Sequence, residues 1–298
     1  CYFHGWKYDG TGQCVEQPAE QDKFAAKVKI KSYPTQEYAG IVFAYMGPGD
    51  PPPFPRQAEL DRDYGAQWSY SMTWPCNWFQ RIENSFDAVH VSFVHRNSAF
   101  GDAVTWAVPE LCYLETEYGL RQIATRSPQN IRISDLTWPN NNHIVTPEGP
   151  NSDKDAWADV IIWFVPVDDE HTIQFGVEHM PVKGEAQRLA EEWVRSRPPY
   201  NPADHHDELF KGNLPWDTRD VVAIAGAQDY IAQIGQGTIT DRSKEWLGVS
   251  DEGALFLRKI FRREIEAVKQ GVPGKHWQPR TGFARLPVPP GVPLPPDN

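Results

Sequence analysis

The alternation of apolar and polar residues predicts two short strands near the start of the chain. Lysines alternate with valine and isoleucine across residues 27–33, which is the two-residue period of a half-buried strand. Residues 40–46 hold a continuous apolar run of strand length, so a more buried strand is expected there. Glycine and proline then dominate residues 47–55, a composition that neither a helix nor a central strand tolerates. We therefore expect a domain boundary near residue 56.

Beyond that boundary the pattern predicts a set of strands followed by a set of helices. Four segments have strand character: residues 68–74, 111–126 (a strand pair), 158–167 and 171–180. Four segments repeat apolar residues at helical spacing: residues 76–95, 185–197, 221–236 and 253–270. The proline-rich tail, residues 287–298, is expected to form an extended arm. Because the helices are gathered late, we expect an α+β fold with an antiparallel sheet.

Composition narrows the functional class. The 298 residues include 29 basic and 40 acidic ones, and the net charge of −11 argues against a nucleic-acid-binding protein. Hydrophobic residues at 40% and charged residues at 23% are typical of an ordinary globular protein. No apolar run approaches the roughly 18 residues of a membrane span. Four cysteines are too few for a disulfide scaffold, and no signal peptide is visible. We expect a cytoplasmic protein.

Cys1 and His4 form the first pattern with metal-ligand spacing. They lie in a turn-rich segment, and a thiolate together with an imidazole suits zinc or an iron–sulfur cluster. Two ligands do not complete a site, so a free cysteine beside a surface histidine is the alternative. Cys14 is expected to fill a small buried apolar position instead of binding metal. Because a ligand pattern begins at the first residue, we expect the chain to be an N-terminally truncated fragment.

Acidic residues and histidines form the second pattern. At about 100° per residue, Glu83, Asp87 and His90 share one face of a helix, whereas His95 lies about 140° from His90. Both histidines can bind one ion only if the helix ends or deforms between them, as it would at a π-bulge. Two neutral imidazoles and one carboxylate form the facial triad that binds Fe(II) in non-haem oxygenases. The alternative is that two histidines five residues apart are incidental.

Both patterns resemble motifs of one family, the Rieske non-haem iron oxygenases. The run CYFHGWKYDGTGQC resembles the second half of the Rieske motif, C-x-x-H-G-W-x-Y-D-x-x-G, and E-x3-D-x2-H-x4-H resembles the family's mononuclear iron motif. The resemblance implies that Cys1 and His4 are two of the four ligands of a [2Fe–2S] cluster. The loop that would supply the other two ligands is not in this chain. Four residues would surround the cluster: Gly5, Trp6, Tyr8 and Gly12.

The same resemblance implies three ligands for a mononuclear iron. His90 and His95 would be two of them, and the third would be an aspartate on a helix late in the chain. Asp229 fits best, because it shares a polar helical stripe with Gln233 and Gln236. The alternative is an aspartate that is simply solvated on an amphipathic helix.

Further residues acquire roles from the resemblance. Asp87 would bridge a ligating histidine to a Rieske histidine of the neighbouring subunit, which implies a homotrimer. Glu83 and Asn84 would lie close around the iron ligands. By contrast, His143 and the pair His205–His206 are expected in polar loops and are not assigned to a site.

The resemblance also implies a fold and an activity. The catalytic domain, residues 57–298, would have a helix-grip fold, in which an antiparallel sheet wraps a long helix. The second half of an all-β Rieske domain, residues 1–56, would precede it. Residues 237–251 resemble the phthalate dioxygenase-like branch, whose oxygenases consist of α subunits alone. The implied reaction hydroxylates an aromatic substrate with O₂, using electrons from NAD(P)H that a reductase or ferredoxin delivers.

Other functions stay open on the sequence. An O-demethylating monooxygenase acting on a methoxy-aromatic would use the same metal site, so the motifs do not separate it from a ring hydroxylase. A helix-grip module that binds an apolar ligand without catalysis is the alternative from another class. A zinc hydrolase fits less well, because no serine, cysteine or glutamate base is recognisably placed.

Overall fold

The chain divides into two compact units, Cys1–Phe54 and Pro55–Asn298. The computed structural model describes residues 1–22, 24–96, 107–127, 130–146, 158–197, 201–216 and 224–280. The division falls in the proline-rich run from which a boundary near residue 56 was expected. The tail at residues 287–298 lies outside the described residues. No helix of the described part combines the length and apolar character that a bilayer span requires.

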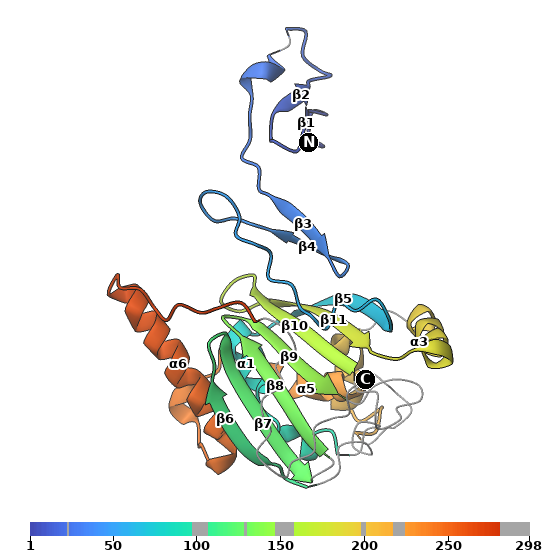
Figure 1. The fold of residues 1–298 in the computed structure, drawn as a ribbon, viewed down its shortest axis with the longest axis vertical. Helices are drawn as coiled ribbons and strands as arrows, with labels where there is room; N and C mark the ends of the chain where they lie inside the picture. Colours follow the sequence, from blue (N-terminus) through green and yellow to red (C-terminus); the bar gives the residue numbers. More distant parts are fainter. Residues whose placement is uncertain are drawn as a thin grey trace. The chain divides into compact units, whose positions relative to one another are not determined.

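Two small antiparallel hairpins make up most of the first unit. Their strands pair as follows: β1 (Lys7–Tyr8) with β2 (Cys14–Glu16), and β3 (Thr35–Tyr38) with β4 (Ile41–Ala44) (Figure 1). Asp9 holds the turn of the first hairpin, because its Oδ1 accepts hydrogen bonds from the amides of Thr11 at 2.9 Å and Gln13 at 3.0 Å. Strand β4 confirms the strand predicted at residues 40–46, but the expectation that it is buried is wrong, because its residues are half-exposed or exposed.

The prediction of a strand at residues 27–33 is wrong. Ala25–Lys27 forms a 3-10 turn, η1, and Lys29 makes an isolated bridge to Gln13. The carbonyl of Val28 accepts hydrogen bonds from the Cys14 amide and from the Gln13 side chain, both at 2.9 Å. The segment therefore binds the hairpin turn through single contacts, which the alternation of its side chains does not distinguish from a strand ladder.

The second unit is built on one seven-stranded sheet whose neighbours all pair antiparallel. In spatial order the strands are β5 (Ala66–Trp74), β11 (Thr172–Met180), β10 (Ala158–Pro166), β9 (Asn141–Thr146), β8 (Asn130–Thr137), β7 (Gly119–Ser127) and β6 (Glu110–Glu115). The predicted strands and the predicted β10–β11 hairpin are confirmed. Strands β8 and β9 were not predicted, and His143 lies in β9 rather than in a loop.

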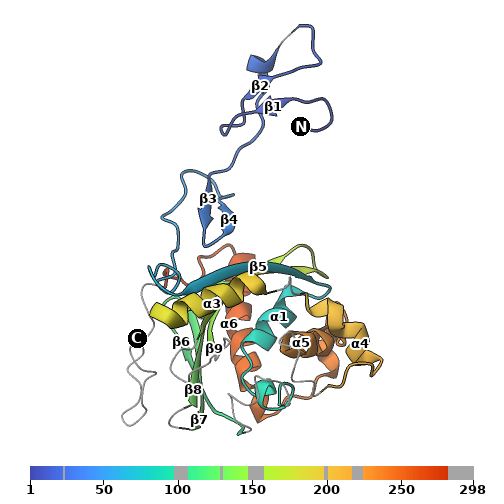
Figure 2. The same ribbon diagram turned by 90° about the vertical axis from the view of Figure 1, so that its right-hand side faces the viewer.

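Helices cover one face of this sheet, and Figure 2 shows α1, α5 and α6 on the same side of it. The helices are α1 (Trp78–Ser85), α3 (Gly184–Ser196), α4 (His206–Phe210), α5 (Ile224–Ile234) and α6 (Glu252–Lys269). The 3-10 turns of this unit are η2 (His90–Ser92), η3 (Pro202–His205), η4 (Arg242–Lys244) and η5 (Val249–Asp251). The predictions of α3, α5 and α6 are confirmed within the described residues, but the helix predicted at 76–95 forms only in its first half.

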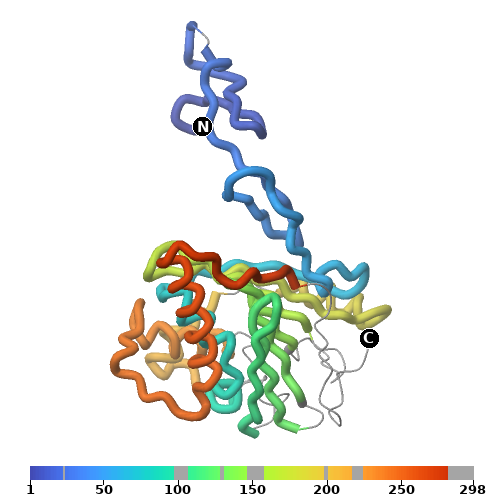
Figure 3. The backbone as a smooth tube through the Cα atoms, turned by 60° about the vertical axis from the view of Figure 1, so that its left-hand side comes forward, coloured from blue at the N-terminus to red at the C-terminus, as the bar shows by residue number. Residues whose placement is uncertain are grey.

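The main hydrophobic core lies between the sheet and helices α1 and α6. Its buried side chains are Leu120, Leu136, Val160, Ile162 and Phe164 from the strands, Ile82 and Phe86 from α1 and its end, and Leu257, Ile260 and Phe261 from α6. Burying each such side chain contributes about 1.5–3 kcal/mol, so this contact fixes the long helix on the sheet. Figure 3 shows α6 beside the edge strand β6, where Arg263 pairs with Glu115 at 2.9 Å. This is the α+β helix-grip arrangement that was expected.

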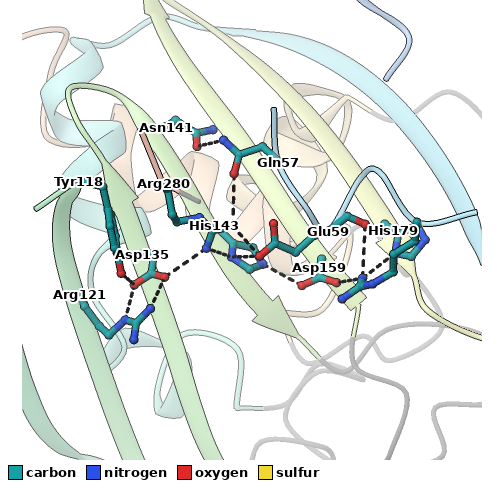
Figure 4. A network of polar contacts seen from close by, with 11 residues as sticks. Gln57, Glu59, Tyr118, Arg121, Asp135, Asn141, His143, Asp159, His179 and Arg280 are labelled. Atoms are coloured by element: carbon teal, nitrogen blue, oxygen red, sulfur yellow. Dashed lines mark hydrogen bonds and ion pairs between the residues drawn. The ribbon is translucent and has the colours of Figure 1, made fainter. Parts of the chain in front are cut away.

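A ladder of ionisable side chains lies on the face of the sheet opposite this core. Because alternate residues of a strand point to opposite faces, the neighbours of Leu120 and Leu136 point away from the helices. One buried side chain from each of five adjacent strands forms the ladder: Arg121, Asp135, His143, Asp159 and His179 (Figure 4). Arg121 donates to Asp135 through Nε at 2.5 Å and through Nη2 at 2.7 Å.

Side chains from outside the sheet complete this ladder. Glu59 and Arg62 come from the segment that enters the second unit, and Arg280 comes from the end of the described chain. Arg280 lies 2.6 Å from Glu59 through Nη2 and donates to His143 Nδ1 at 2.7 Å. Buried charges are tolerated when each has a partner of opposite charge. These contacts also hold the segment that enters this unit and the end of the described chain against the sheet.

We expect the ladder to make stability fall as the solution becomes acidic. Arg62 donates to His179 Nδ1 at 3.0 Å, so His179 stays neutral and its Nε2 donates to the Tyr64 carbonyl at 2.8 Å. Burial lowers the pKa of His179 and the charge of Arg62 lowers it further, although the Tyr64 contact acts in the opposite direction. Between this lowered pKa and about 6.5, the unfolded chain binds more protons than the folded chain. The free energy of unfolding therefore falls as the pH is lowered through that window.

Urea unfolding at a series of pH values from 7.5 to 5 checks this expectation. The His179→Gln variant keeps one donor and one acceptor but does not titrate, so its free energy of unfolding should decline less steeply over the same window. His171, on the exposed β10–β11 turn, supplies the matched control as His171→Gln, which should keep the wild-type slope. Equal slopes for the wild type and His179→Gln would contradict the assignment.

Candidate metal centre

Helix α1 positions the first group of site residues and ends earlier than expected. Asn77 caps it, because its Oδ1 accepts from the Phe79 amide at 3.0 Å. The helix ends at Ser85, and the Asp87 carboxylate then accepts from the Val89 amide at 2.7 Å. This local bond offers the backbone an alternative to the helix, so a new turn begins there. The break was expected between His90 and His95, but it lies before both of them.

The break brings two imidazoles together with a carboxylate from α5. The rings of His90 and His95 have centroids 5.3 Å apart. Asp229 Oδ1 lies 3.6 Å from His90 Nε2 and 3.2 Å from His95 Nε2. One ligand atom from each residue lies within 4.8 Å of the other two. Over the described ranges, no other group of three or more histidine, cysteine, aspartate or glutamate side chains converges in this way.

The outer nitrogen of each imidazole has a hydrogen-bond acceptor. His90 Nδ1 lies 3.2 Å from Asp87 Oδ2, and His95 Nδ1 lies 3.0 Å from Gln228 Oε1. Both Nδ1 atoms can therefore carry the proton when an ion is bound, which would leave the Nε2 lone pairs for that ion. Metal-binding histidines are oriented in this manner, by a carboxylate or carbonyl oxygen on the nitrogen that does not bind the ion.

The charges at the three side chains favour a bound cation. Burial alone would raise the pKa of Asp229, yet the charges of His95 and His90 and a hydrogen bond from His95 hold it well below its usual range. Burial would likewise lower the pKa of His95, but the charge of Asp229 outweighs it and raises that pKa. The carboxylate is thus ionised at neutral pH. Two imidazole nitrogens and one carboxylate oxygen fit the donor set of an Fe(II) facial triad.

Glu83 and Asn84, the two residues expected close around the iron ligands, have different surroundings. Asn84 Nδ2 lies 3.4 Å from Asp229 Oδ1, so it contacts one of the three converging side chains. Glu83 instead accepts from Arg258 Nε at 2.6 Å and pairs with Arg242 at 2.7 Å. It therefore ties α1 to α6 and η4 and does not contact the three converging side chains through these bonds.

Three residues near the site were not predicted from the sequence. Gln228 accepts a hydrogen bond from His95, and the charges of Arg126 and Arg132 act near the site. Gln228 directly precedes Asp229, and this adjacency was the available signal. The arginines lie in alternating strand segments, where an arginine is ordinarily a surface residue.

Cys1 and His4 lie in the first unit and are both exposed. Gly5 donates its amide to the Cys1 carbonyl at 2.9 Å, which closes a turn between the two side chains. No third histidine, cysteine, aspartate or glutamate of the described chain joins them in a group. The half-cluster stays a prediction. Cys14 is buried, as expected.

Comparisons with known proteins place these observations in context. No protein-family model matches the chain. It is 29% identical to the 5,5'-dehydrodivanillate O-demethylase oxygenase subunit of Sphingobium sp., over 91% of this chain and 62% of that protein. It is 28% identical to the phthalate 4,5-dioxygenase oxygenase subunit of Pseudomonas putida, over 91% of this chain and 68% of that protein. The chain thus spans about two-thirds of the length of these curated relatives.

Solved structures show the same fold. The Pseudomonas putida CBB5 NdmA QL mutant with caffeine matches with a TM-score of 0.61 at 18% identity, covering 91% of this chain and 72% of that chain. The terminal oxygenase of carbazole 1,9a-dioxygenase from Nocardioides aromaticivorans IC177 matches with a TM-score of 0.56 at 20% identity, covering 87% and 75%. The relatives that this chain matches in sequence are thus Rieske oxygenase subunits, and the solved structures show that it shares the fold of such proteins.

Proposed function

We propose that this chain is the catalytic part of an oxygenase subunit that hydroxylates an aromatic substrate with O₂. The observation that carries the proposal is the convergence of His90 Nε2, His95 Nε2 and Asp229 Oδ1 within 4.8 Å. These three residues would hold Fe(II) on one face, and the ion would supply the activation of O₂ at its open positions.

The surrounding side chains would orient the ligands. Asp87 and Gln228 each accept from an Nδ1, which fixes the tautomer and the direction of the ring. Asn84 donates to the Asp229 carboxylate and limits its rotation. Phe86 and Val91 are buried beside this segment and would help to keep bulk water from the site.

The partners of the enzyme belong to the same proposal. Cys1 and His4 would supply two of the four ligands of a [2Fe–2S] cluster, as the resemblance of their motif implies. A reductase or ferredoxin would deliver electrons that originate from NAD(P)H. Asp87 would join His90 to a His4 of a neighbouring subunit in a homotrimer, consistent with a side chain that is 39% exposed although it contacts His90.

O-demethylation of a methoxy-aromatic is the second candidate function. It is favoured by the Sphingobium relative, which is named as an O-demethylase. The phthalate relative is instead named as a dioxygenase. Product analysis separates the two, because demethylation releases the methyl carbon whereas ring hydroxylation leaves it on the substrate.

Anaerobic loading of the full chain with Fe(II) tests the proposal. After desalting, we expect about one Fe(II) per chain, in agreement with one three-ligand group. The His90→Ala variant should lose this iron, whereas His171→Ala, on an exposed turn, should keep it. An iron-free protein that still binds an aromatic compound would contradict the oxygenase and support a non-catalytic binding module.

A further inference from the structure

Arg81 on α1 has a buried guanidinium that joins this helix to α5 and to the sheet. The residue is 5% exposed. Its Nη1 donates to Gln233 Oε1 on α5 at 2.6 Å, and its Nη2 donates to Gln174 Oε1 on β11. Nη1 also lies 3.5 Å from Asn84 Oδ1, three residues further along α1. One arginine can hold several acceptors at once, because its guanidinium carries five N–H donors in a fixed plane.

Side chains of three adjacent strands fix the position of this guanidinium. Gln174 on β11 pairs with Phe164 on β10, and Phe164 is a core residue, so both point to the face of the sheet that carries the helices. The Arg81 Cζ atom lies 3.5 Å from the ring centroid of Trp74 on β5 and 5.6 Å from that of Phe164. A guanidinium away from water is attracted to the faces of such rings. Arg81 is therefore held on the sheet by rings as well as by Gln174.

Gln233 transmits this fixed position to α5. It follows Asp229 by four residues, so the two side chains lie on the same face of the helix. Gln233 is 2% exposed, and its Nε2 has no hydrogen-bond partner among the described residues, whereas its Oε1 accepts from Arg81. A rotation of α5 about its axis would move both side chains together. The bond at Gln233 therefore also restricts the direction in which Asp229 points.

Asn84 connects Arg81 to Asp229 by a second route. Its Oδ1 lies 3.5 Å from Arg81 Nη1, and its Nδ2 lies 3.4 Å from Asp229 Oδ1. Both contacts are long, so their contribution is orientation more than binding strength. The reverse orientation of the amide would place its oxygen against an ionised carboxylate and its NH₂ group against a guanidinium, and both contacts would be repulsive. Arg81 thus favours the orientation in which Asn84 donates to Asp229.

The three converging side chains come from two separate pieces of chain. His90 and His95 follow α1, whereas Asp229 lies on α5. A shift between the two pieces would change the distances from Asp229 Oδ1 to the two Nε2 atoms, which are 3.6 Å and 3.2 Å. A metal site binds its ion well only if supporting residues hold the ligands close to the required geometry. The bond from Arg81 to Gln233 joins the two helices that carry these pieces.

We propose that Arg81 is a positioning residue for the metal centre, which acts through Gln233 and Asn84 to keep Asp229 facing the two histidines. This inference rests on the proposed function of the iron site and deepens it. Arg81 acts through the two amides and is not itself a ligand. Because it supplies geometry, the planar fork of the guanidinium is required, and a positive charge alone does not replace it.

Metal titration of the full chain and its conservative variants tests the proposal. Fe(II) and Co(II) are titrated anaerobically against a competing chelator, and the visible absorption of bound Co(II) reports the ligand geometry. Arg81→Lys keeps the charge but cannot hold Gln233 and Gln174 in one plane. We expect its metal affinity to fall by about 10–100-fold, the usual cost of losing a supporting partner, and its Co(II) spectrum to change.

Arg121→Lys is the matched control. Arg121 is 1% exposed and donates to both carboxylate oxygens of Asp135, but it lies on the opposite face of the sheet. This variant should keep the metal affinity and the Co(II) spectrum of the wild type. Urea unfolding of the iron-free proteins measures the loss of stability in both variants. A metal affinity that followed the free energy of unfolding in Arg121→Lys as in Arg81→Lys would show a merely structural role and overturn the proposal.

Gln233→Leu tests the same contact from α5 and leaves the charge of Arg81 in place. We expect a similar loss of metal affinity, and the double variant with Arg81→Lys should bind about as weakly as either single variant, because both changes break one contact. Losses that add up would overturn the proposal. If Arg81→Lys does not fold, Gln233→Leu decides alone, and wild-type metal binding in Gln233→Leu overturns the proposal.

Failure of the iron site itself gives a different result. A wild-type chain that binds neither Fe(II) nor Co(II) contradicts the proposed function. A wild-type chain that binds both, together with an Arg81→Lys variant of equal affinity and equal spectrum, shows that the charge is sufficient and overturns the positioning role alone.

Discussion

The Asp229→Ala variant should purify as a folded protein without iron and without oxygenase activity. Asp229 supplies the one carboxylate of the three converging side chains, and its Oδ1 lies 3.2 Å from His95 Nε2. Removing an outer partner of a metal ligand typically costs 10–100-fold in metal affinity, so loss of the ligand itself should cost at least about 100-fold. Iron content after anaerobic loading and desalting measures this effect, and circular dichroism confirms the fold.

Histidine titration of the iron-free proteins gives an independent test of the same carboxylate. In the wild type the charge of Asp229 raises the pKa of His95 against the effect of burial. Without Asp229, burial acts with little opposition, so the pKa of His95 should fall. Asp168→Ala, which changes an exposed aspartate on the β10–β11 turn, should alter neither iron content nor this titration. Stoichiometric iron in Asp229→Ala would contradict the assignment of the third ligand.

Most of the sheet and the late helices could be predicted from the sequence because their patterns are long. The β10–β11 hairpin has two nine-residue strands joined by an acidic turn, and α6 repeats apolar residues over 18 positions. Residues 27–33 were misassigned because a short alternation does not tell a ladder from single contacts. His143 was misplaced because the three asparagines before it suggest a loop, whereas Asn141 and Asn142 bury their amides against the Ile162 and Ser85 carbonyls.

The site could be predicted only in part. The spacing of Asp87, His90 and His95 indicated a metal motif, but not where the backbone bends, because that depends on one side-chain bond to the Val89 amide. Asp229 could be chosen with the help of the family resemblance, since residues far apart in the sequence meet only in the folded chain. Arg81 gave no signal, because only the fold brings its acceptors on α5 and β11 to it.

The Asp87→Ala variant should retain iron and lose turnover that is coupled to NADH. Three ligands remain in this variant, so iron should still bind when Fe(II) is in excess. Asp87 Oδ2 lies 3.2 Å from His90 Nδ1, but the Asp87 side chain is more exposed than that of His90, at 39% against 16%. An aspartate that only oriented His90 would need no exposure. Exposure is required if the same carboxylate also accepts from a histidine of a neighbouring subunit.

Gln228 supplies the matched control, because it holds His95 as Asp87 holds His90, while Gln228 itself is fully buried. Gln228→Ala should weaken iron binding by about 10–100-fold, the usual cost of losing such a partner, and keep coupled turnover once iron is saturating. Asp87→Ala should show a similar weakening and, in addition, no NADH-dependent product in an enzyme with a complete cluster. Product formation equal to that of Gln228→Ala would mean that Asp87 only orients His90, because a bridge between subunits cannot be removed without interrupting the delivery of electrons.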